Sequence, residues 1–151
     1  MAVATFTGPK IFGNVVFIPK SSGSMNVQFN LKGFKPNKTH AIHIHEFGDM
    51  RKGCKSLGPH WNPTKKNHGS IWLDCCKRHA GDLINNLESN KKGHFNYKYR
   101  DPMLSLKGII GRSVVIHDGV DDLGRGDNKE SLITGNAGSR MACAIIGYAN
   151  I

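Results

Sequence analysis

Residues 39–46 alternate two kinds of side chain in a pattern that is typical of a β-strand. Within the letters AIHIHE, Ile42 and Ile44 occupy one set of positions, and His43 and His45 occupy the other. Successive side chains of a strand point to opposite faces, so one face is apolar and the other carries imidazoles. Residues i and i+2 lie about 6.6 to 7 Å apart at Cα, so both rings can bind one metal ion. A pair of surface histidines is the alternative interpretation.

The rest of the chain consists of short β-type runs separated by Gly, Pro and Asn. Glycine is abundant, at 18 of 151 residues, which favours many turns over long helices. Short strands at this spacing are typical of an all-β sandwich or barrel. We expect strands at 2–7, 14–18, 25–31, 39–46, 81–87, 94–99, 113–117 and 142–148.

Two long segments, 47–80 and 118–140, lack strand character. Loops of this length are uncommon in compact domains and are usually functional. Something other than a hydrophobic core must order them, and a metal site would do so.

The formal net charge is +10. Three interpretations stay open: a solvated basic surface, steering of a small anion, or adhesion to nucleic acid and other polyanions. The lysines are scattered, and the sequence has no zinc-finger, homeodomain or RNA-binding motif, so no specific nucleic-acid partner is predicted.

The first residues lack a basic region followed by an apolar run, and no stretch approaches the roughly 18 apolar residues of a membrane-spanning helix. We therefore expect a cytoplasmic protein without membrane association. The four cysteines allow three pairings, which the residues alone leave open, and an intracellular disulfide needs a special reason. These cysteines are Cys54, Cys75, Cys76 and Cys143.

Further histidines fall into a second group along the first long segment and its exit. His60, His68 and His79 are followed by Asp82. Three imidazoles and one carboxylate suit tetrahedral Zn²⁺. His117 ends the apolar run SVVIH and can bring a third imidazole to His43 and His45, although an exposed histidine would be the simpler interpretation of His117 alone.

Five motifs extend this pattern over essentially the whole chain: HIHEFGD, GCKSLGPHWNP, HAGDL, HDGVDDLGRGDNKES and TGNAGSRMACAIIG. In order and spacing they resemble the copper/zinc superoxide dismutases. The resemblance implies one domain, 1–151, folded as a flattened eight-stranded antiparallel Greek-key barrel, an immunoglobulin-like sandwich with two long functional loops. It also implies dismutation of superoxide to O₂ and H₂O₂ by copper bridged to zinc, as an antioxidant defence.

The resemblance assigns a role to each matching position. Arg140 would dock the anion, Thr134 would narrow the channel, and Asp121 would hold one ligand histidine of each metal. Cys54 and Cys143 would form a disulfide that ties the first long loop to the last strand. His40 and His94 match no ligand and are expected at the surface. Copper would be bound by His43, His45, His60 and His117, and zinc by His60, His68, His79 and Asp82.

The family is mostly homodimeric, and the corresponding surfaces here are DMRKG, GIIGR and AIIGYANI, with apolar Ile109, Ile145 and Tyr148. A proline of some chaperone-dependent relatives is absent after Arg140, so a copper chaperone is an expected partner that is not strictly required. The alternative function is a catalytically weak dismutase-like protein that binds metals or a copper chaperone.

One departure from the family pattern lies between His68 and His79, where the loop is about two residues longer than usual. It carries Trp72 and the adjacent Cys75 and Cys76. A tolerated surface insertion is one interpretation. Changed zinc affinity or additional thiol chemistry is the other, because adjacent thiols can compete for metal or exchange with a disulfide.

Overall fold

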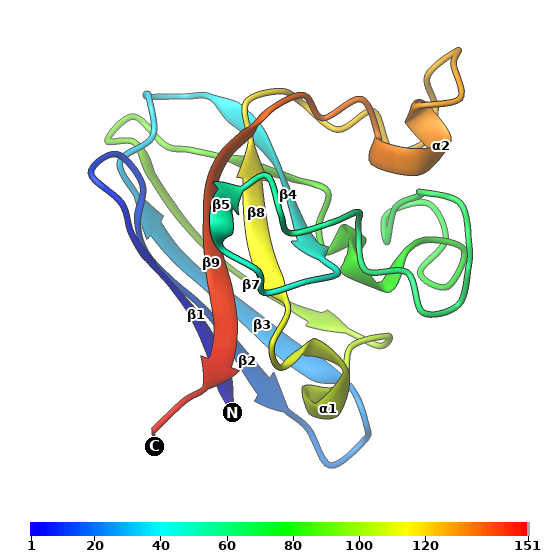
Figure 1. Ribbon diagram of the computed structural model, residues 1–151, viewed down its shortest axis with the longest axis horizontal. Coiled ribbons are helices and arrows are strands. Elements are labelled where there is room, and N and C mark those ends of the chain that lie inside the picture. The colour runs from blue at the N-terminus through cyan, green and yellow to red at the C-terminus, as the bar shows by residue number, and fades with distance from the viewer. Residues whose placement is uncertain (151) are drawn as a thin grey trace.

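Nine strands and three short helical turns make up the fold in the computed structural model, which describes residues 1–150 (Figure 1). None of the helices within those residues is long and apolar enough to cross a membrane. The strands are β1 (Ala2–Thr7), β2 (Phe12–Pro19), β3 (Met25–Lys32), β4 (Thr39–His45), β5 (Arg51–Cys54), β6 (Asn86–Glu88), β7 (His94–Asp101), β8 (Ser113–His117) and β9 (Arg140–Tyr148). The helical turns are η1 (Ala80–Asp82), α1 (Leu106–Ile109) and α2 (Ser131–Thr134).

Eight of these strands form one antiparallel sheet in the order β6-β4-β8-β9-β1-β2-β3-β7. The edge strands β6 and β7 follow each other in the chain, so the short connection 89–93 joins the two edges and nearly closes the sheet into a barrel. The chain crosses from β3 to β4 on the other side of the sheet, which gives the Greek-key order. The fold class expected from the sequence is confirmed.

The alternation of side chains places the core inside this barrel. Val27, Phe29 and Leu31 of β3 are buried there, and Ile42 and Ile44 of β4 are fully buried against the same core. The opposite face of β4 is also buried, although its side chains are imidazoles. In Figure 1 the two long loops lie beside the ends of β4 and β8 and cover this outer face.

Seven of the eight expected strands are present with small changes at their ends. The expected strand 81–87 is wrong for most of its length, since it begins with η1 and only Asn86–Glu88 pairs with β4. Leu83 has φ 48° and Asn85 has φ 62°, and a left-handed backbone of this kind is incompatible with an extended strand. The long segments also contain β5 and α2, which the sequence did not indicate.

A disulfide joins Cys54 at the end of β5 to Cys143 of β9, across a sequence separation of 89 residues. This confirms the pairing implied by the family resemblance. The bond fixes the first long loop to the wall of the barrel at one point, close to where Met50 contacts Cys143. Cys75 and Cys76 stay free and exposed.

Removing this bond is expected to destabilise the protein strongly. Cys143→Ser should lower the free energy of unfolding by about 4–5 kcal/mol, because a long closed loop restricts the unfolded chain. Urea unfolding of metal-depleted protein without reductant measures the change. The matched control, Cys75→Ser with Cys76→Ser, removes two exposed thiols and should stay within about 0.5 kcal/mol of the parent protein. Equal unfolding midpoints for the Cys143→Ser variant and the control would contradict the expectation.

Candidate metal centre

Four buried imidazoles converge where β4, β8 and the first long loop meet. His43 and His45 come from the outer face of β4, and His117 comes from the end of β8, which pairs with β4. His60 comes from the loop and forms an isolated bridge with His45. One ring nitrogen from each residue lies within 4.8 Å of the others in this first group, which is His43, His45, His60 and His117.

The ring nitrogens that face the interior of this group have few protein partners. His43 Nδ1 and His60 Nε2 are buried and make no hydrogen bond to any described residue. His45 Nε2 and His117 Nε2 lie 3.2 Å apart and face each other. Buried nitrogens without a partner are costly, and a metal ion would satisfy all four. A set of imidazole nitrogens suits copper.

The other nitrogens of these rings are held by fixed acceptors. His43 Nε2 donates to Asp121 Oδ2 at 2.6 Å, and His45 Nδ1 donates to the carbonyl of Gly58 at 2.8 Å. His117 Nδ1 donates to the carbonyl of Gly138 at 3.1 Å. Such contacts set the tautomer and orientation of a ligand histidine, so each ring presents its free nitrogen to the group.

A second group surrounds Asp82 at the end of η1. Asp82 Oδ1 lies 3.1 Å from His60 Nδ1, 2.8 Å from His68 Nδ1 and 3.2 Å from His79 Nδ1. Its other oxygen, Oδ2, accepts hydrogen bonds from the backbone N–H groups of His79 and Gly69. Three imidazole nitrogens and one carboxylate oxygen are a donor set that Zn²⁺ prefers. The turn at η1 therefore positions a compact second metal group.

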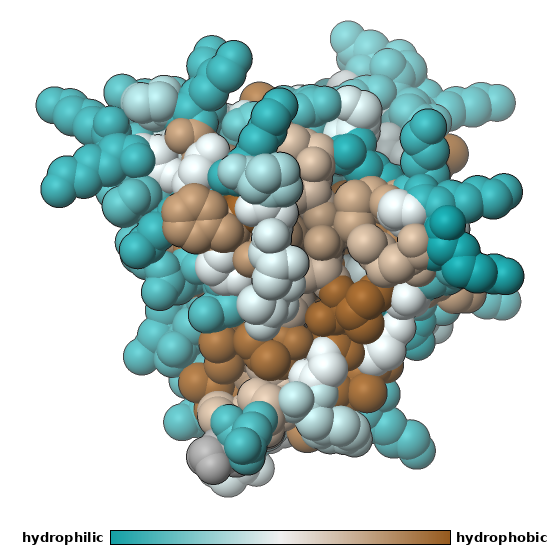
Figure 2. Space-filling view, turned by 60° about the vertical axis from the view of Figure 1, so that its left-hand side comes forward, coloured by the Kyte–Doolittle hydropathy of each residue, from teal (hydrophilic) through white to brown (hydrophobic). Residues whose placement is uncertain are grey.

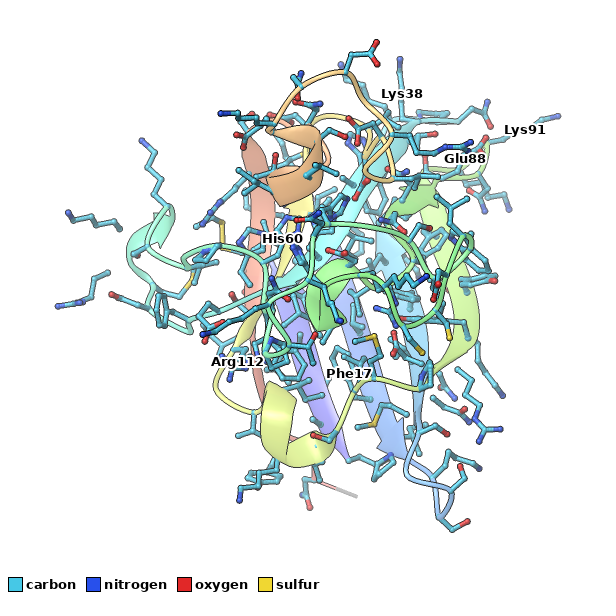
Figure 3. All side chains as sticks on the ribbon, turned by 90° about the vertical axis from the view of Figure 1, so that its right-hand side faces the viewer. Phe17, Lys38, His60, Glu88, Lys91 and Arg112 are labelled. Carbon is cyan, nitrogen blue, oxygen red and sulfur yellow. A yellow bond between two sulfur atoms is a disulfide. The ribbon has the colours of Figure 1, made fainter. Side chains whose placement is uncertain are left out.

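His60 belongs to both groups. Its Nδ1 faces Asp82 and its Nε2 faces the imidazole of the first group, so one ring lies between two metal positions. Figure 3 shows His60 in front of the barrel strands and just below the helical turn α2 of the second long loop.

Asp121 links the two groups from the second long loop. Its Oδ2 accepts from His43 and its Oδ1 accepts from His68 Nε2 at 2.8 Å. Asn86 fixes the backbone of Asp121 in both directions, because its amide nitrogen donates to the Asp121 carbonyl and its amide oxygen accepts the Asp121 N–H. One carboxylate thus contacts an imidazole of each group, so a shift of the imidazole in one group can alter the hydrogen bond to the other.

A cavity of about 360 Å³ opens to solvent beside the first group. Arg140 lies in its wall and donates to the carbonyls of Cys54 at 2.7 Å and Gly58 at 2.6 Å. Thr134 lies at the other side and donates to Glu130. The lining residues are His45, Pro59, His60, His117, Glu130, Thr134, Asn136, Ala137, Gly138 and Arg140.

The model of one protein family, described as copper/zinc superoxide dismutase, matches residues 11–146. The chain belongs to the copper/zinc superoxide dismutase family. The Cu-Zn superoxide dismutase of Yarrowia lipolytica is 47% identical over 151 residues, which cover 97% of this chain and 96% of the relative. That of Saccharomyces cerevisiae is 44% identical over 154 residues, covering 99% and 98%.

A viral relative and a solved structure extend the comparison. The Cu-Zn superoxide dismutase of Paramecium bursaria Chlorella virus 1 is 45% identical over 98% of this chain and 78% of its own length. The crystal structure of the clock protein EA4 superimposes with a TM-score of 0.90 at 39% identity, covering 97% of this chain and 92% of that one. Family membership and the two groups together support copper and zinc as the cofactors of this superoxide dismutase family member.

The structure brings together every ligand position named from the sequence, but His40 differs from expectation. It is half-buried, its Nδ1 lies 3.0 Å from the carbonyl oxygen of His117, and its ring packs on Phe34. His40 and His94 are both partly exposed, so the expected surface position holds only in part for each. His40 supports the backbone of a ligand position without entering either group.

Sequence reasoning missed three residues that support the centre. The carbonyl of Gly58 accepts from both Arg140 and His45, yet a backbone acceptor leaves no signal in a sequence. Asn86 resembles an ordinary turn residue. Arg78 is fully buried and pairs with Asp101 at 2.8 Å, whereas a basic residue in a polar loop is normally exposed.

Burial makes the first group neutral at physiological pH when no metal is bound. It lowers the pKa of His43 to about 3, with the nearby His60 adding to the effect, and it lowers the pKa of His117 to about 4. Neutral imidazoles are the metal-binding form, so these nitrogens need not lose a proton to bind copper.

The second group behaves in the opposite way. Burial alone would lower the pKa of His68, but hydrogen bonds with Asp121 and Asp82 outweigh it and raise the pKa to about 9. Burial alone would raise the pKa of Asp82, but hydrogen bonds from the surrounding imidazoles hold it well below its usual range. In metal-depleted protein a proton on His68 thus supplies part of the positive charge that a bound metal ion would bring to the group.

These opposite shifts predict that the metal-depleted protein is most stable near pH 6.5, the ordinary value for histidine. Stability from His68 is fully present below that pH and is lost as pH rises toward about 9. Below pH 6.5 the unfolded chain protonates its histidines, whereas His117 and His43 resist protonation until about 4 and about 3, so stability falls there too.

Urea midpoints of metal-depleted protein at pH 4.5, 6.5 and 8.5 measure this dependence. His68→Gln should remove the alkaline loss and leave the acidic loss. Zinc-loaded protein should also lack the alkaline loss, because the metal replaces the proton. Midpoints that rise steadily from pH 6.5 to 8.5 in metal-depleted protein would contradict the prediction.

Proposed function

We propose that the two groups form a single copper–zinc centre that dismutes superoxide to O₂ and H₂O₂. Copper is held by the four imidazoles of the first group, and zinc is held by the second. The observation that carries the proposal is the position of His60, whose two nitrogens face the two groups. The proposed ligands are His43, His45, His60 and His117 for copper, and His60, His68, His79 and Asp82 for zinc.

When bound, copper supplies reversible one-electron exchange with superoxide, while zinc has no redox chemistry. The protein supplies the proton path. His60 Nε2 is buried and makes no hydrogen bond to any residue from 1 to 150, and the ring lines the cavity, so this atom can hold a proton and release it to reduced oxygen. Two superoxide ions and two protons give one O₂ and one H₂O₂, and His60 provides one of the two protons in each cycle.

Arg140 is the proposed docking residue for the anion. Its two hydrogen bonds to the carbonyls of Cys54 and Gly58 fix the guanidinium plane in the cavity wall. A guanidinium carries five N–H donors, so donors are left over for superoxide. Thr134 faces the same cavity and limits its width to small anions. The net charge of +10 favours approach of an anion from a distance.

Asp121 is the proposed positioning residue for both metals, since it orients His43 and His68 without facing either group directly. Outer partners of this kind typically contribute 10- to 100-fold to metal affinity or activity, as an order of magnitude. The alternative function, a dismutase-like protein that binds metals or a chaperone, is disfavoured by the presence of Arg140 and of four converging imidazoles.

Three further parts of the proposal concern the whole protein. A single domain, 1–151, is supported by the pairing of β1 with β9, which joins the two ends of the described chain in one sheet. A copper chaperone is proposed to assist without being strictly required, because the proline that some chaperone-dependent relatives carry is absent after Arg140. The cytoplasmic location stays a prediction.

A homodimer is proposed through the apolar area shown in brown in Figure 2, which teal side chains border. Ile145 and Tyr148 of β9 are 37% and 72% exposed, and Ile145 lies against Gly48 and next to Gly111. An apolar patch of this kind, with a polar border, is typical of an interface. Ile109 does not contribute, since it is fully buried in the core of its own chain, and Ile151 lies outside the described residues.

Pulse radiolysis of protein isolated from copper- and zinc-supplied cells that lack a copper chaperone tests the activity. Superoxide dismutases are known to approach the diffusional ceiling of about 10⁸–10⁹ M⁻¹s⁻¹, and a rate in that range is expected here. Arg140→Ala should lower the rate about 10- to 100-fold, the loss expected when a hydrogen bond to a charged group is removed. The rate of Arg140→Lys should lie between those of the parent protein and Arg140→Ala.

Arg100→Ala is the matched control, because it removes the same charge from β7 and should leave the rate nearly unchanged. A rate no higher than that of metal-free protein, with both metals confirmed bound, would turn the assignment to the metal- or chaperone-binding alternative. Activity that appears only after reconstitution in vitro would contradict activation without a chaperone, but it would leave the dismutase assignment intact.

The proposed dimer is tested by Ile145→Lys, which places a charge in the apolar area. Parent protein should sediment as a dimer, and the variant should sediment as a monomer at micromolar concentration. Val120→Lys is the control, since Val120 is 54% exposed on the second long loop. A parent protein that sediments as a monomer would refute the dimer.

A further inference from the structure

The loop between His68 and His79 holds two thiols side by side at the protein surface. Cys75 Sγ and Cys76 Sγ lie 3.0 Å apart, and both residues are exposed. The carboxylate of Asp74 accepts the backbone N–H of Cys76 at 3.0 Å and that of Lys77 at 3.3 Å. These hydrogen bonds fix the turn, so the two sulfurs are held together by the backbone around them.

The distance between the sulfurs favours a bond between them over a shared metal ion. Two thiolates bound to one tetrahedral zinc at 2.3 Å would lie about 3.8 Å apart. The observed 3.0 Å is shorter than that and needs to close by about 1 Å to reach the length of a disulfide.

We propose that Cys75 and Cys76 form a reversible oxidation site, in which hydrogen peroxide converts the two thiols into a disulfide between adjacent residues. The source of peroxide rests on the proposed function, because superoxide dismutation releases H₂O₂ from the same molecule. The oxidation itself needs only peroxide and the two thiols.

The step balances as a two-electron oxidation. The thiolate of one cysteine attacks the O–O bond of peroxide, forming an S–O bond and releasing hydroxide. The neighbouring thiolate then attacks the sulfenic sulfur, so an S–S bond forms, the S–O bond breaks and a second hydroxide leaves. The two thiol protons and the two hydroxides become two water molecules.

A disulfide at this position is expected to be easily reduced. Adjacent Cα atoms are 3.8 Å apart across a trans peptide, which is below the usual 4.4–6.8 Å of disulfides, so the ring is strained. The exposure of both residues also admits a thiol reductant. Strained and exposed disulfides are the labile and regulatory ones.

Arg78 connects this site to the zinc group. Its Nε donates to the carbonyl of Cys75 at 3.0 Å, and its Nη1 donates to the carbonyl of His79 at 3.2 Å. The side chain is fully buried, and its Nη2 pairs with Asp101 at 2.8 Å. Because the sulfurs must close by about 1 Å, we expect the peptide between Cys75 and Cys76 to shift, and with it the Cys75 carbonyl that accepts from Arg78 Nε. Loss of a hydrogen-bond partner is unfavourable for a buried guanidinium, so the Arg78 side chain is expected to shift. That shift would move the carbonyl of His79, which accepts from Arg78 Nη1.

Peptide mapping of the metal-loaded protein tests the oxidation. After treatment with added H₂O₂ and alkylation with iodoacetamide, the tryptic peptide 67–77 should carry no alkyl group. Its mass should be about 2 Da below that of the reduced, unalkylated peptide, through loss of two hydrogens. Dithiothreitol should restore full alkylation. Cys75→Ser and Cys76→Ser should each give no disulfide and a sulfenic acid that dimedone traps. A parent peptide that stays fully alkylated, or that proceeds to sulfinic acid without a disulfide, would overturn the proposal.

Copper-free, zinc-loaded protein serves as a second sample. Because the peroxide is added, the disulfide should form there too, so a failure of the proposed dismutation and a failure of the oxidation site are separately visible.

Zinc transfer to a chromogenic chelator tests the connection through Arg78. Oxidised parent protein should release zinc about 10-fold faster than reduced protein, at the lower end of effects from outer partners of metal ligands. The double variant Cys75→Ser with Cys76→Ser should show no effect of peroxide. Equal release from oxidised and reduced parent protein, with the disulfide confirmed by mass, would refute the connection to zinc.

Discussion

Six histidines and two aspartates are removed from water together in this protein, and the rest of the structure depends on how they are satisfied. Burying so many polar and ionisable groups is unfavourable unless each finds a partner. The barrel supplies part of the answer, since β4 presents isoleucines to the core and imidazoles to the outside. The remainder must come from the loops, which have little apolar content of their own to order them.

Each loop is tied to the barrel where it is needed. The first is fixed by the disulfide between Cys54 and Cys143 and by the guanidinium of Arg140. The second is fixed through Asp121, which contacts one imidazole of each group and is held by Asn86. The metal groups and the loop anchors are therefore one connected network. Loss of a metal is expected to loosen the loops, and a loosened loop is expected to bind metal less tightly.

Much of this network was predictable because it follows from side-chain type and period. The alternation around His43 and His45 indicated a strand with an imidazole face, and the spacing from His60 to Asp82 indicated a zinc group. The long loops were also predictable as functional. The expected strand 81–87 was wrong because Leu83 and Asn85 adopt positive φ. Leucine has no intrinsic preference for positive φ, so nothing in the sequence indicated this backbone conformation.

The supporting contacts were beyond the reach of the sequence for a different reason. Arg78 is buried with Asp101, which lies 23 positions later in the chain, and only the folded barrel brings them together. His40 shares the alternating set of Ile42 and Ile44, so the strand period could have indicated its inward face, but its contact with the backbone of His117 on the neighbouring strand is visible only in the fold. Contacts of this kind form between residues that are distant in the sequence, whereas the ligands within one loop are close enough in the sequence for their spacing to be recognised.

The carbonyl of Gly58 accepts from both Arg140 and His45, so a backbone atom joins the proposed anion-docking group to a proposed copper ligand. A peptide oxygen is the same whatever side chain its residue carries, so no base change in the gene can delete this acceptor. Replacement is opposed for a separate reason, since Gly58 has φ 73° and an added Cβ would meet the ring of Phe47 at 2.6 Å. The alignment of the proposed docking group with the proposed copper ligand therefore depends on the course of the backbone at Gly58 and not on a side chain.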